Sequence, residues 1–292
     1  MGTEAAMADE TGRSHRVELN GLGFHYLTWG DPEHPLLICL HGLRSYGRTF
    51  EGVAAALEGR FHVLALDQRG RGESDWDPGR NYFTPAYVSD LEALVARLGI
   101  ARFHLLGHSM GGMNALLYAA RNPGRLQSLI LEDSGPEAPE GLSSGLTRIL
   151  GELERTPLSF ADLDAARAFW RSIRPNVTAD AIESRTRNSM VERDGRIVWR
   201  HDQEGIAACR IAQARATERL DLWPAVDAID CPTLVLRGAR SDYLDADRVR
   251  QMCARNPHIR ASEIPDAGHY VHDDNPVAFI RAVSDFLQPF SP

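Results

Sequence analysis

Apolar and polar positions along this chain of 292 residues follow first a strand pattern and then an alternation of strands and helices. Residues 15–19 and 23–29 alternate on either side of Asn20 and Gly21, a pair that strongly favours a tight hairpin turn. Nearly continuous apolar runs at 35–40 and 61–66 are typical of strands that helices cover on both faces. The chain is therefore predicted to open with an antiparallel pair and to continue into a parallel sheet.

Predicted helices alternate with further predicted strands between residues 50 and 131 and again between residues 233 and 287. Such alternation predicts an α/β protein with a mostly parallel central sheet and helices on both faces. The predicted elements are helices at 50–57, 85–98, 110–120 and 278–287, and strands at 103–106, 126–131, 233–236 and 260–264.

The alternation stops between residues 136 and 230, where helical segments dominate. We interpret 136–230 as a helical cap inserted into a core formed by 15–135 and 231–292. Residues 1–14 are polar and acidic, lack the pattern of a secretory signal, and are predicted to form a disordered tail. Within the cap, helices are predicted at 146–154, 160–172, 179–191 and 205–216, with a turn at 193–196 and an extended segment at 197–200.

Composition narrows the classes of function. The hydrophobic fraction of 43% suits a globular core, and the length suits one large domain with an insertion. A net charge of −8 argues against a nucleic-acid ligand, because backbone phosphates call for a basic face. No apolar stretch is long enough to span a bilayer, so we expect a cytoplasmic protein without a membrane partner. The four cysteines lack metal-type spacing, so neither disulfides nor a zinc site is expected.

The strongest chemical signal is a glycine-flanked serine, Ser109, in the segment 107–112 that directly follows the predicted strand at 103–106. The pattern Gly-x-Ser-x-Gly also occurs at 141–145, but acidic, turn-forming residues precede that copy and cannot form a buried strand. Strand, serine turn and helix together are typical of a nucleophile elbow. Ser109 is therefore the predicted nucleophile, and the N–H of Met110, at a helix N-terminus, is the first predicted oxyanion donor.

A serine hydroxyl needs a base, and the base needs a carboxylate to orient it. His269 is the predicted base, because it lies in the loop after the strand at 260–264, on the sheet edge where Ser109 is expected. Asp242 is the predicted acid on chain order and loop position, and Asp133 is its competitor. The N–H of Leu43, after the strand at 35–40, is the second predicted oxyanion donor.

Other residues are weaker candidates for substrate contact. His41 and Arg44 flank the predicted oxyanion loop, and Arg44 could equally face solvent. Trp170 and Trp199 either line an apolar substrate cavity or belong to the core of the cap. The spacing of His269 and His272 is a poor metal signal outside a helix, so no metal site is predicted.

Four motifs, in this order, resemble those of the α/β-hydrolase fold family over about residues 15 to 290. His41-Gly42 is similar to the oxyanion loop of the family, and 67–74 to its turn after the next core strand. Residues 107–111 resemble its nucleophile elbow, and Gly268-His269 resembles its histidine loop.

The resemblance implies a catalytic triad of Ser109, Asp242 and His269, with Leu43 and Met110 as oxyanion donors. It also implies a cap that shapes the pocket, and no cofactor. We therefore expect a serine hydrolase that cleaves a carboxylic ester or lactone of a small, largely apolar molecule through an acyl-enzyme. Carbon–carbon bond hydrolases, cofactor-independent oxygenases and a non-catalytic small-molecule receptor stay open as alternatives, and so does a homodimer.

Overall fold

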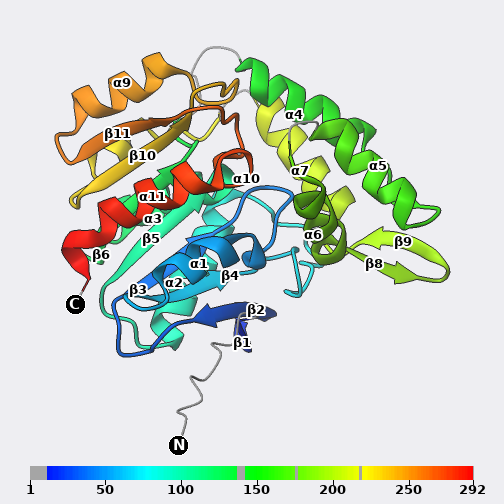
Figure 1. The fold of residues 1–292 in the computed structure, drawn as a ribbon, viewed down its shortest axis with the longest axis horizontal. Coiled ribbons are helices and arrows are strands. Elements are labelled where there is room, and N and C mark those ends of the chain that lie inside the picture. The colour runs from blue at the N-terminus through cyan, green and yellow to red at the C-terminus, as the bar shows by residue number, and fades with distance from the viewer. Residues whose placement is uncertain (1–11, 137–141, 175–176, 217–218, 292) are drawn as a thin grey trace, which may run out of the picture.

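The computed structural model describes residues 12–136, 142–174, 177–216 and 219–291. Its centre is an eight-stranded sheet in the order β1-β2-β4-β3-β5-β6-β10-β11 (Figure 1). The pairs β1–β2 and β2–β4 are antiparallel, and the strands from β4 to β11 run parallel to their neighbours. The strands are β1 (Arg13–Leu19), β2 (Leu22–Trp29), β3 (Leu36–Leu40), β4 (His62–Leu66), β5 (Phe103–His108), β6 (Leu126–Glu132), β10 (Thr233–Gly238) and β11 (Ile259–Ile264). The predicted fold class is confirmed.

The opening hairpin turns at the predicted pair. Asn20 and Gly21 both have positive φ, 51° and 77°, which the tight turn between β1 and β2 requires. Strand β1 begins at Arg13, so the last two residues of the predicted tail belong to the sheet, while residues 1–11 of that tail lie outside the described residues.

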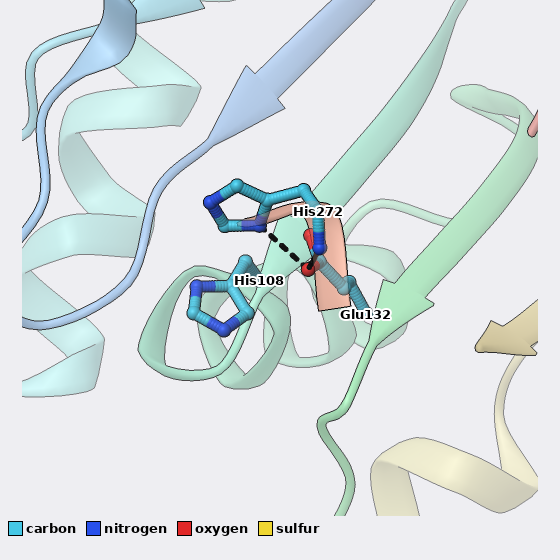
Figure 2. A group of neighbouring side chains, drawn as sticks. All are labelled: His108, Glu132 and His272. Carbon is cyan, nitrogen blue, oxygen red and sulfur yellow. Dashed lines mark hydrogen bonds and ion pairs between the residues drawn. The ribbon is translucent and has the colours of Figure 1, made fainter. Parts of the chain in front are cut away.

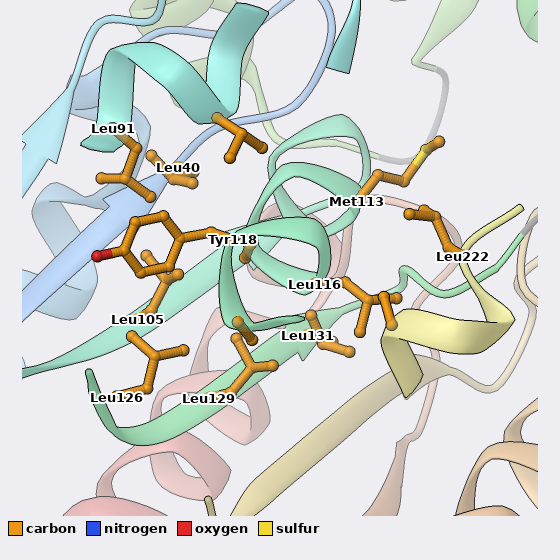
Figure 3. Close-up of a cluster of buried hydrophobic side chains, with 14 of the residues drawn as sticks. Leu40, Leu91, Leu105, Met113, Leu116, Tyr118, Leu126, Leu129, Leu131 and Leu222 are labelled. Carbon is orange, nitrogen blue, oxygen red and sulfur yellow. The ribbon is translucent and has the colours of Figure 1, made fainter. Parts of the chain in front are cut away.

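Two apolar layers bury the two faces of the sheet. Alternate residues of β3 divide between them, with Ile38 and Leu40 in one cluster and Leu37 and Cys39 in the other. On the first face α3 packs against β5 and β6, as Figure 3 shows. The first cluster includes side chains of α2 (Thr84–Arg97), α3 (Met110–Arg121), α8 (Trp223–Asp227) and α9 (Ala246–Arg255), and the second those of α1 (Glu51–Leu57), α10 (Val271–Asp274) and α11 (Pro276–Leu287).

Between β6 and β10, the described residues from 142 to 216 form a layer of their own beside the sheet (Figure 1). Each of its four helices begins at a side chain, Ser143, Asp162, Thr178 or Asp202, that accepts a hydrogen bond from a backbone N–H of the first turn. The helices are α4 (Ser144–Arg155), α5 (Leu163–Ile173), α6 (Ala179–Ser189) and α7 (Gln203–Arg215), close to the predicted positions.

This layer also contains a small antiparallel sheet. The sequence predicted only one part of it, the extended segment 197–200. Its order is β7-β9-β8, formed by β7 (Ser159–Phe160), β8 (Met190–Arg193) and β9 (Arg196–Trp199). The predicted helix at 179–191 ends earlier, because Met190 pairs with Trp199 across a turn in which Asp194 and Gly195 have positive φ. None of the described helices is both long and apolar enough to cross a membrane.

Candidate active site

Ser109 occupies a strained turn between β5 and α3, as predicted for a nucleophile elbow. Its φ is 52° and its ψ −115°, a backbone conformation that residues with a side chain rarely adopt. A Cβ at Gly107 would collide with the backbone of Gly111, and a Cβ at Gly111 would collide with the carbonyl of Leu40. The two glycines therefore let the elbow close against the end of β3.

Ser109, His269 and Asp133 form a hydrogen-bonded chain. The Ser109 Oγ lies 2.9 Å from His269 Nε2, and His269 Nδ1 lies 2.8 Å from Asp133 Oδ2. The Asp133 carboxylate also accepts hydrogen bonds from the Ser241 hydroxyl, at 2.6 Å, and from the Gly238 N–H, at 3.1 Å. The side chains of His269 and Asp133 are 2% and 0% exposed. This arrangement is that of a serine nucleophile, its base and an orienting carboxylate.

The prediction that Asp242 contacts His269 is wrong. Asp242 forms an ion pair with Arg148 of α4, its Oδ2 2.8 Å from Arg148 Nε, and its side chain is 38% exposed. Strand register explains the difference: His108 of β5 pairs with Glu132 of β6, so Ser109 and Asp133 leave neighbouring strands at the same level.

The position of Asp242 follows from the same register. Glu132 is also level with Leu236 of β10, and Asp242 comes six residues after Leu236, beyond the turn that Ser241 closes. A sequence signal for Asp133 was present, because it is the first residue after a strand that directly follows the nucleophile helix.

The loop after β3 brings Leu43 to the elbow. A Cβ at Gly42 would lie 3.6 Å from the Ser109 Cβ, so the loop runs directly beside the nucleophile. The guanidinium of Arg71, fully buried, donates from Nε to the Leu43 carbonyl at 3.0 Å and from Nη2 to the Met110 sulfur at 3.4 Å. One arginine thus holds both predicted oxyanion residues, a function that the sequence did not reveal.

Comparison with known proteins places this geometry in a family. The model for the alpha/beta hydrolase fold matches residues 35–276. The chain belongs to the alpha/beta hydrolase fold family. It is a hydrolase, like several of the curated relatives that it resembles.

Two similar proteins extend along nearly all of this α/β-hydrolase. The 3-hydroxybutyrate-oligomer hydrolase of Cupriavidus necator is 34% identical over 256 residues, covering 84% of this chain and 86% of the relative. The 2-(acetamidomethylene)succinate hydrolase of Mesorhizobium japonicum is 28% identical, and the match covers 98% of this chain and 99% of the relative. A crystal structure of E-2-(acetamidomethylene)succinate hydrolase superposes with a TM-score of 0.85 at 27% identity, covering 95% of this chain and 99% of that one.

A cavity of about 600 Å³, part of it open to solvent, lies over Ser109 in this α/β-hydrolase. Its walls come from the core and from two cap helices, α4 and α7. They consist of Leu43, Arg44, Tyr82, Thr84, Tyr87, Ser109, Met110, Met113, Ile149, Arg210, Gln213, Tyr243, His269 and Tyr270. Leu43 and Met110 therefore border the same space as the nucleophile, as the predicted oxyanion donors must.

The weaker predictions of substrate contact have mixed outcomes. Arg44 lines the cavity, where its guanidinium forms an ion pair with Glu152 of α4. His41 is fully buried instead, its Nδ1 2.8 Å from the Gly42 carbonyl and its Nε2 accepting from the N–H of Gln68. His41 therefore supports the predicted oxyanion loop through hydrogen bonds and is not among the residues that line the cavity.

Trp170 and Trp199 pack inside the cap and are not among the residues that line the cavity, so their prediction as substrate contacts is wrong. Their rings lie 5.6 Å apart in an edge-to-face arrangement. The small sheet formed by β7, β8 and β9 gives the cap an apolar core that needs these large side chains.

Replacing Trp170 by Ala is expected to destabilise the cap. Because this side chain is fully buried, the loss of its contacts and the cavity left behind should lower the free energy of unfolding by about 3–5 kcal/mol. Denaturant unfolding measures this change. Trp76→Ala is the matched control, because Trp76 is 45% exposed and should cost far less; equal losses for the two variants would contradict the assignment.

The imidazole of His269 is held in its neutral form. The pKa of His269 is lowered from 6.5 to about 3, mainly by burial and also by the positive charges of Arg174 and Arg148, while Asp242 opposes the shift. Burial raises the pKa of the Asp133 carboxyl, and the hydrogen bonds from Ser241 and Gly238 oppose that rise. A neutral imidazole is the form that can accept the proton of Ser109.

The pH dependence of the reaction should reflect this lowered pKa. Activity needs neutral His269, so kcat/KM falls as the pH drops through the pKa of His269 in the free enzyme. Since that pKa lies below the ordinary 6.5, activity should persist through pH 6 toward pH 5. The measurement is kcat/KM against pH, with circular dichroism to follow folding at each pH. An acid limb at pH 6.5 or above in folded protein would contradict this assignment.

A second cluster of buried side chains lies close to the triad in the sequence and is drawn in Figure 2. It consists of His108, Glu132 and His272, whose ligand atoms all lie within 4.8 Å of one another, close enough to consider a metal ion. Their existing contacts favour a structural function instead. Glu132 Oε1 lies 2.6 Å from His272 Nδ1 and accepts from the His272 N–H, and His108 Nε2 lies 2.9 Å from the His269 carbonyl.

Each member of this cluster is close in sequence to Ser109, Asp133 or His269, so the cluster connects the three segments that carry these residues. Although burial lowers it, the pKa of His272 is raised overall, because Glu132 and Asp273 favour the charged imidazolium. The resulting ion pair between Glu132 and His272 fixes the loop that carries His269 to the end of β6.

Proposed function

We propose that the protein is a cofactor-free serine hydrolase that cleaves a carboxylic ester or lactone of a small molecule through an acyl-enzyme on Ser109. The observation that carries this proposal is the aligned chain Ser109–His269–Asp133, whose two hydrogen bonds measure 2.9 and 2.8 Å. A receptor that only binds a small molecule has no need of this alignment. The cytoplasmic location expected from the sequence belongs to the same proposal.

The reaction proceeds in two halves. His269 Nε2 accepts the proton of Ser109 while Oγ attacks the carbonyl carbon, and the N–H groups of Leu43 and Met110 stabilise the oxyanion that forms. His269 then gives that proton to the departing alcohol, and the acyl group remains on Ser109. A water molecule, losing its proton to His269, attacks the acyl-enzyme, which releases the acid and restores Ser109. Asp133 holds the Nδ1 proton and stabilises the imidazolium in both halves.

A substrate panel tests the proposal. Wild-type protein is assayed with esters of increasing acyl length, lactones, amides and thioesters, and Ser109→Ala protein purified in the same way serves as the blank. We expect ester or lactone hydrolysis in the wild type alone. Turnover of none of these substrates, or equal turnover by both proteins, would contradict the proposal.

A further inference from the structure

The turn at 67–74, directly after β4, buries two arginines, and only one of them has a matching carboxylate. Arg69 pairs with Asp90, its Nε 2.6 Å from Oδ2, and its Nη1 lies 2.7 Å from Asp77 Oδ2. Arg71 is 0% exposed and forms no ion pair with any residue that the structure describes. A guanidinium keeps its positive charge in proteins, so this turn holds one buried charge that no carboxylate neutralises.

The contacts of Arg71 are all with uncharged groups. Its Nε donates to the Leu43 carbonyl at 3.0 Å, and its Nη2 lies 3.4 Å from the Met110 sulfur. Its Nη1 donates to the Arg69 carbonyl at 2.9 Å and to the Tyr87 hydroxyl. The guanidinium also lies 5.1 Å from the centre of the Tyr87 ring, a cation–π contact. These contacts hold the guanidinium without neutralising its charge.

The charge lies close to the place where negative charge develops in the reaction. The Leu43 N–H, a predicted oxyanion donor, belongs to the residue whose carbonyl Arg71 binds. One residue of backbone and two hydrogen bonds therefore separate the guanidinium from the oxyanion, a path of at most about 10 Å. At an effective dielectric constant of about 20, a unit charge at this distance favours an opposite charge by about 10-fold.

The same charge favours the anionic form of a neighbouring side chain. Burial raises the pKa of Tyr87, and the positive charge of Arg71 is the first of the influences that oppose this rise. Tyr87 lines the cavity over Ser109. The field of Arg71 therefore extends to the wall of the cavity in which the oxyanion forms.

We propose that Arg71 supplies a positive charge behind the oxyanion hole that stabilises the tetrahedral intermediate, in addition to holding Leu43 and Met110 in place. This inference rests on the proposed function, because the intermediate forms only if Ser109 attacks a carbonyl group. Arg71 is fully buried and is not among the residues that line the cavity, so it is a positioning residue that does not touch the substrate. A charge that is already fixed in the interior needs no reorganisation when the oxyanion forms.

This charge distinguishes the transition state from the bound ester. The carbonyl group of an ester is neutral and gains little from a distant charge, whereas the oxyanion gains the full interaction. An interaction made only in the transition state raises kcat and leaves KM nearly unchanged. Arg71 should therefore affect the rate of acylation much more than substrate binding.

The test compares two inhibitors that differ in the charge they carry once bound. A pentyl trifluoromethyl ketone adds Ser109: a bond forms between Oγ and the carbonyl carbon, the Ser109 proton passes to His269, and the carbonyl electron pair remains on oxygen as an oxyanion. Pentyl methyl ketone binds with its carbonyl group intact and neutral. The inhibition constants of both ketones are measured against hydrolysis of the same ester.

Arg71→Met should raise the inhibition constant of the trifluoromethyl ketone by at least about 10-fold and that of the methyl ketone by less than about twofold. The same variant should lower kcat for the ester by a similar factor, with KM nearly unchanged. Arg71→Lys keeps the charge but loses part of the hydrogen bonding, so it should retain most of the affinity for the trifluoromethyl ketone. Thermal unfolding establishes that each variant is folded.

Arg16→Gln is the control, because the Arg16 side chain is 60% exposed and pairs with Glu73 of the same turn. Water screens such a charge, so neither inhibition constant should change. Equal losses for both ketones in Arg71→Met would overturn the inference and leave the proposed function standing. A loss in Arg71→Lys as large as that in Arg71→Met would do the same.

The lysine variant decides alone if Arg71→Met does not fold. A folded Arg71→Lys protein whose affinity for the trifluoromethyl ketone falls by about 10-fold or more, with the methyl ketone unchanged, would then overturn the inference, because its charge is still present. A wild-type protein that binds the trifluoromethyl ketone no more tightly than Ser109→Ala protein does would contradict the proposed function instead.

Discussion

Replacing Asp133 by Asn should lower kcat for a good ester substrate by about 10⁴-fold, as loss of the triad carboxylate does in other serine hydrolases. The physical reason is the tautomer of the base. An amide at position 133 can present its NH₂ group to His269 Nδ1, so the ring carries its proton on Nε2, the atom that must accept from Ser109. The measurement is kcat for wild type and variant, with thermal unfolding to establish that the variant is folded.

The matched control for this prediction is Asp242→Asn. Asp242 forms a half-exposed ion pair with Arg148, and such pairs contribute little, so kcat should change by less than about fivefold. If Asp242→Asn caused the large loss and Asp133→Asn did not, the assignment of the triad acid would be reversed.

Ser109→Ala should have a still larger effect, a loss of kcat of about 10⁶-fold, because no other group can form the acyl-enzyme. His269→Ala should cost about as much, and the double variant should lose little more, since the two residues act as one unit. Single-turnover and steady-state rates on the preferred ester measure these losses. If the double variant instead lost about the product of the two single losses, Ser109 and His269 would act independently of each other.

The folded state should survive the Ser109→Ala change. Ser109 is buried at a strained turn, and alanine leaves out only the hydroxyl, so the free energy of unfolding should change by less than about 1.5 kcal/mol. Denaturant unfolding provides this control. An unfolded variant would mean that its lack of activity carries no information on the nucleophile, in which case Ser109→Cys replaces it.

Local sequence patterns predicted those elements that depend only on residues close together in the chain. The Asn20–Gly21 hairpin follows from two residues that accept positive φ, and the elbow follows from glycines that let two backbones approach. The parallel strands follow from apolar runs that only a doubly covered sheet can bury. His269 followed from its place after β11, because loops at this edge of a parallel sheet converge on one site.

Features that depend on register or on packing between distant segments were not predictable in this way. The choice between Asp133 and Asp242 depends on which residues of β5, β6 and β10 are level, and the sequence does not state that register. The function of Trp170 depends on a small sheet whose strands are two to four residues long. The burial of Arg174 depends on how the end of α5 meets Tyr270, and from the sequence alone this arginine was indistinguishable from a solvated one.

The most direct test of the central claim, that Ser109 is a nucleophile activated by His269 and Asp133, is labelling with a fluorophosphonate followed by mass spectrometry. The account predicts one adduct per chain, on the peptide that contains Ser109, formed rapidly in the wild type, slowly in Asp133→Asn and not at all in Ser109→Ala. An adduct on another residue, or a wild-type protein that stays unlabelled while folded, would contradict it.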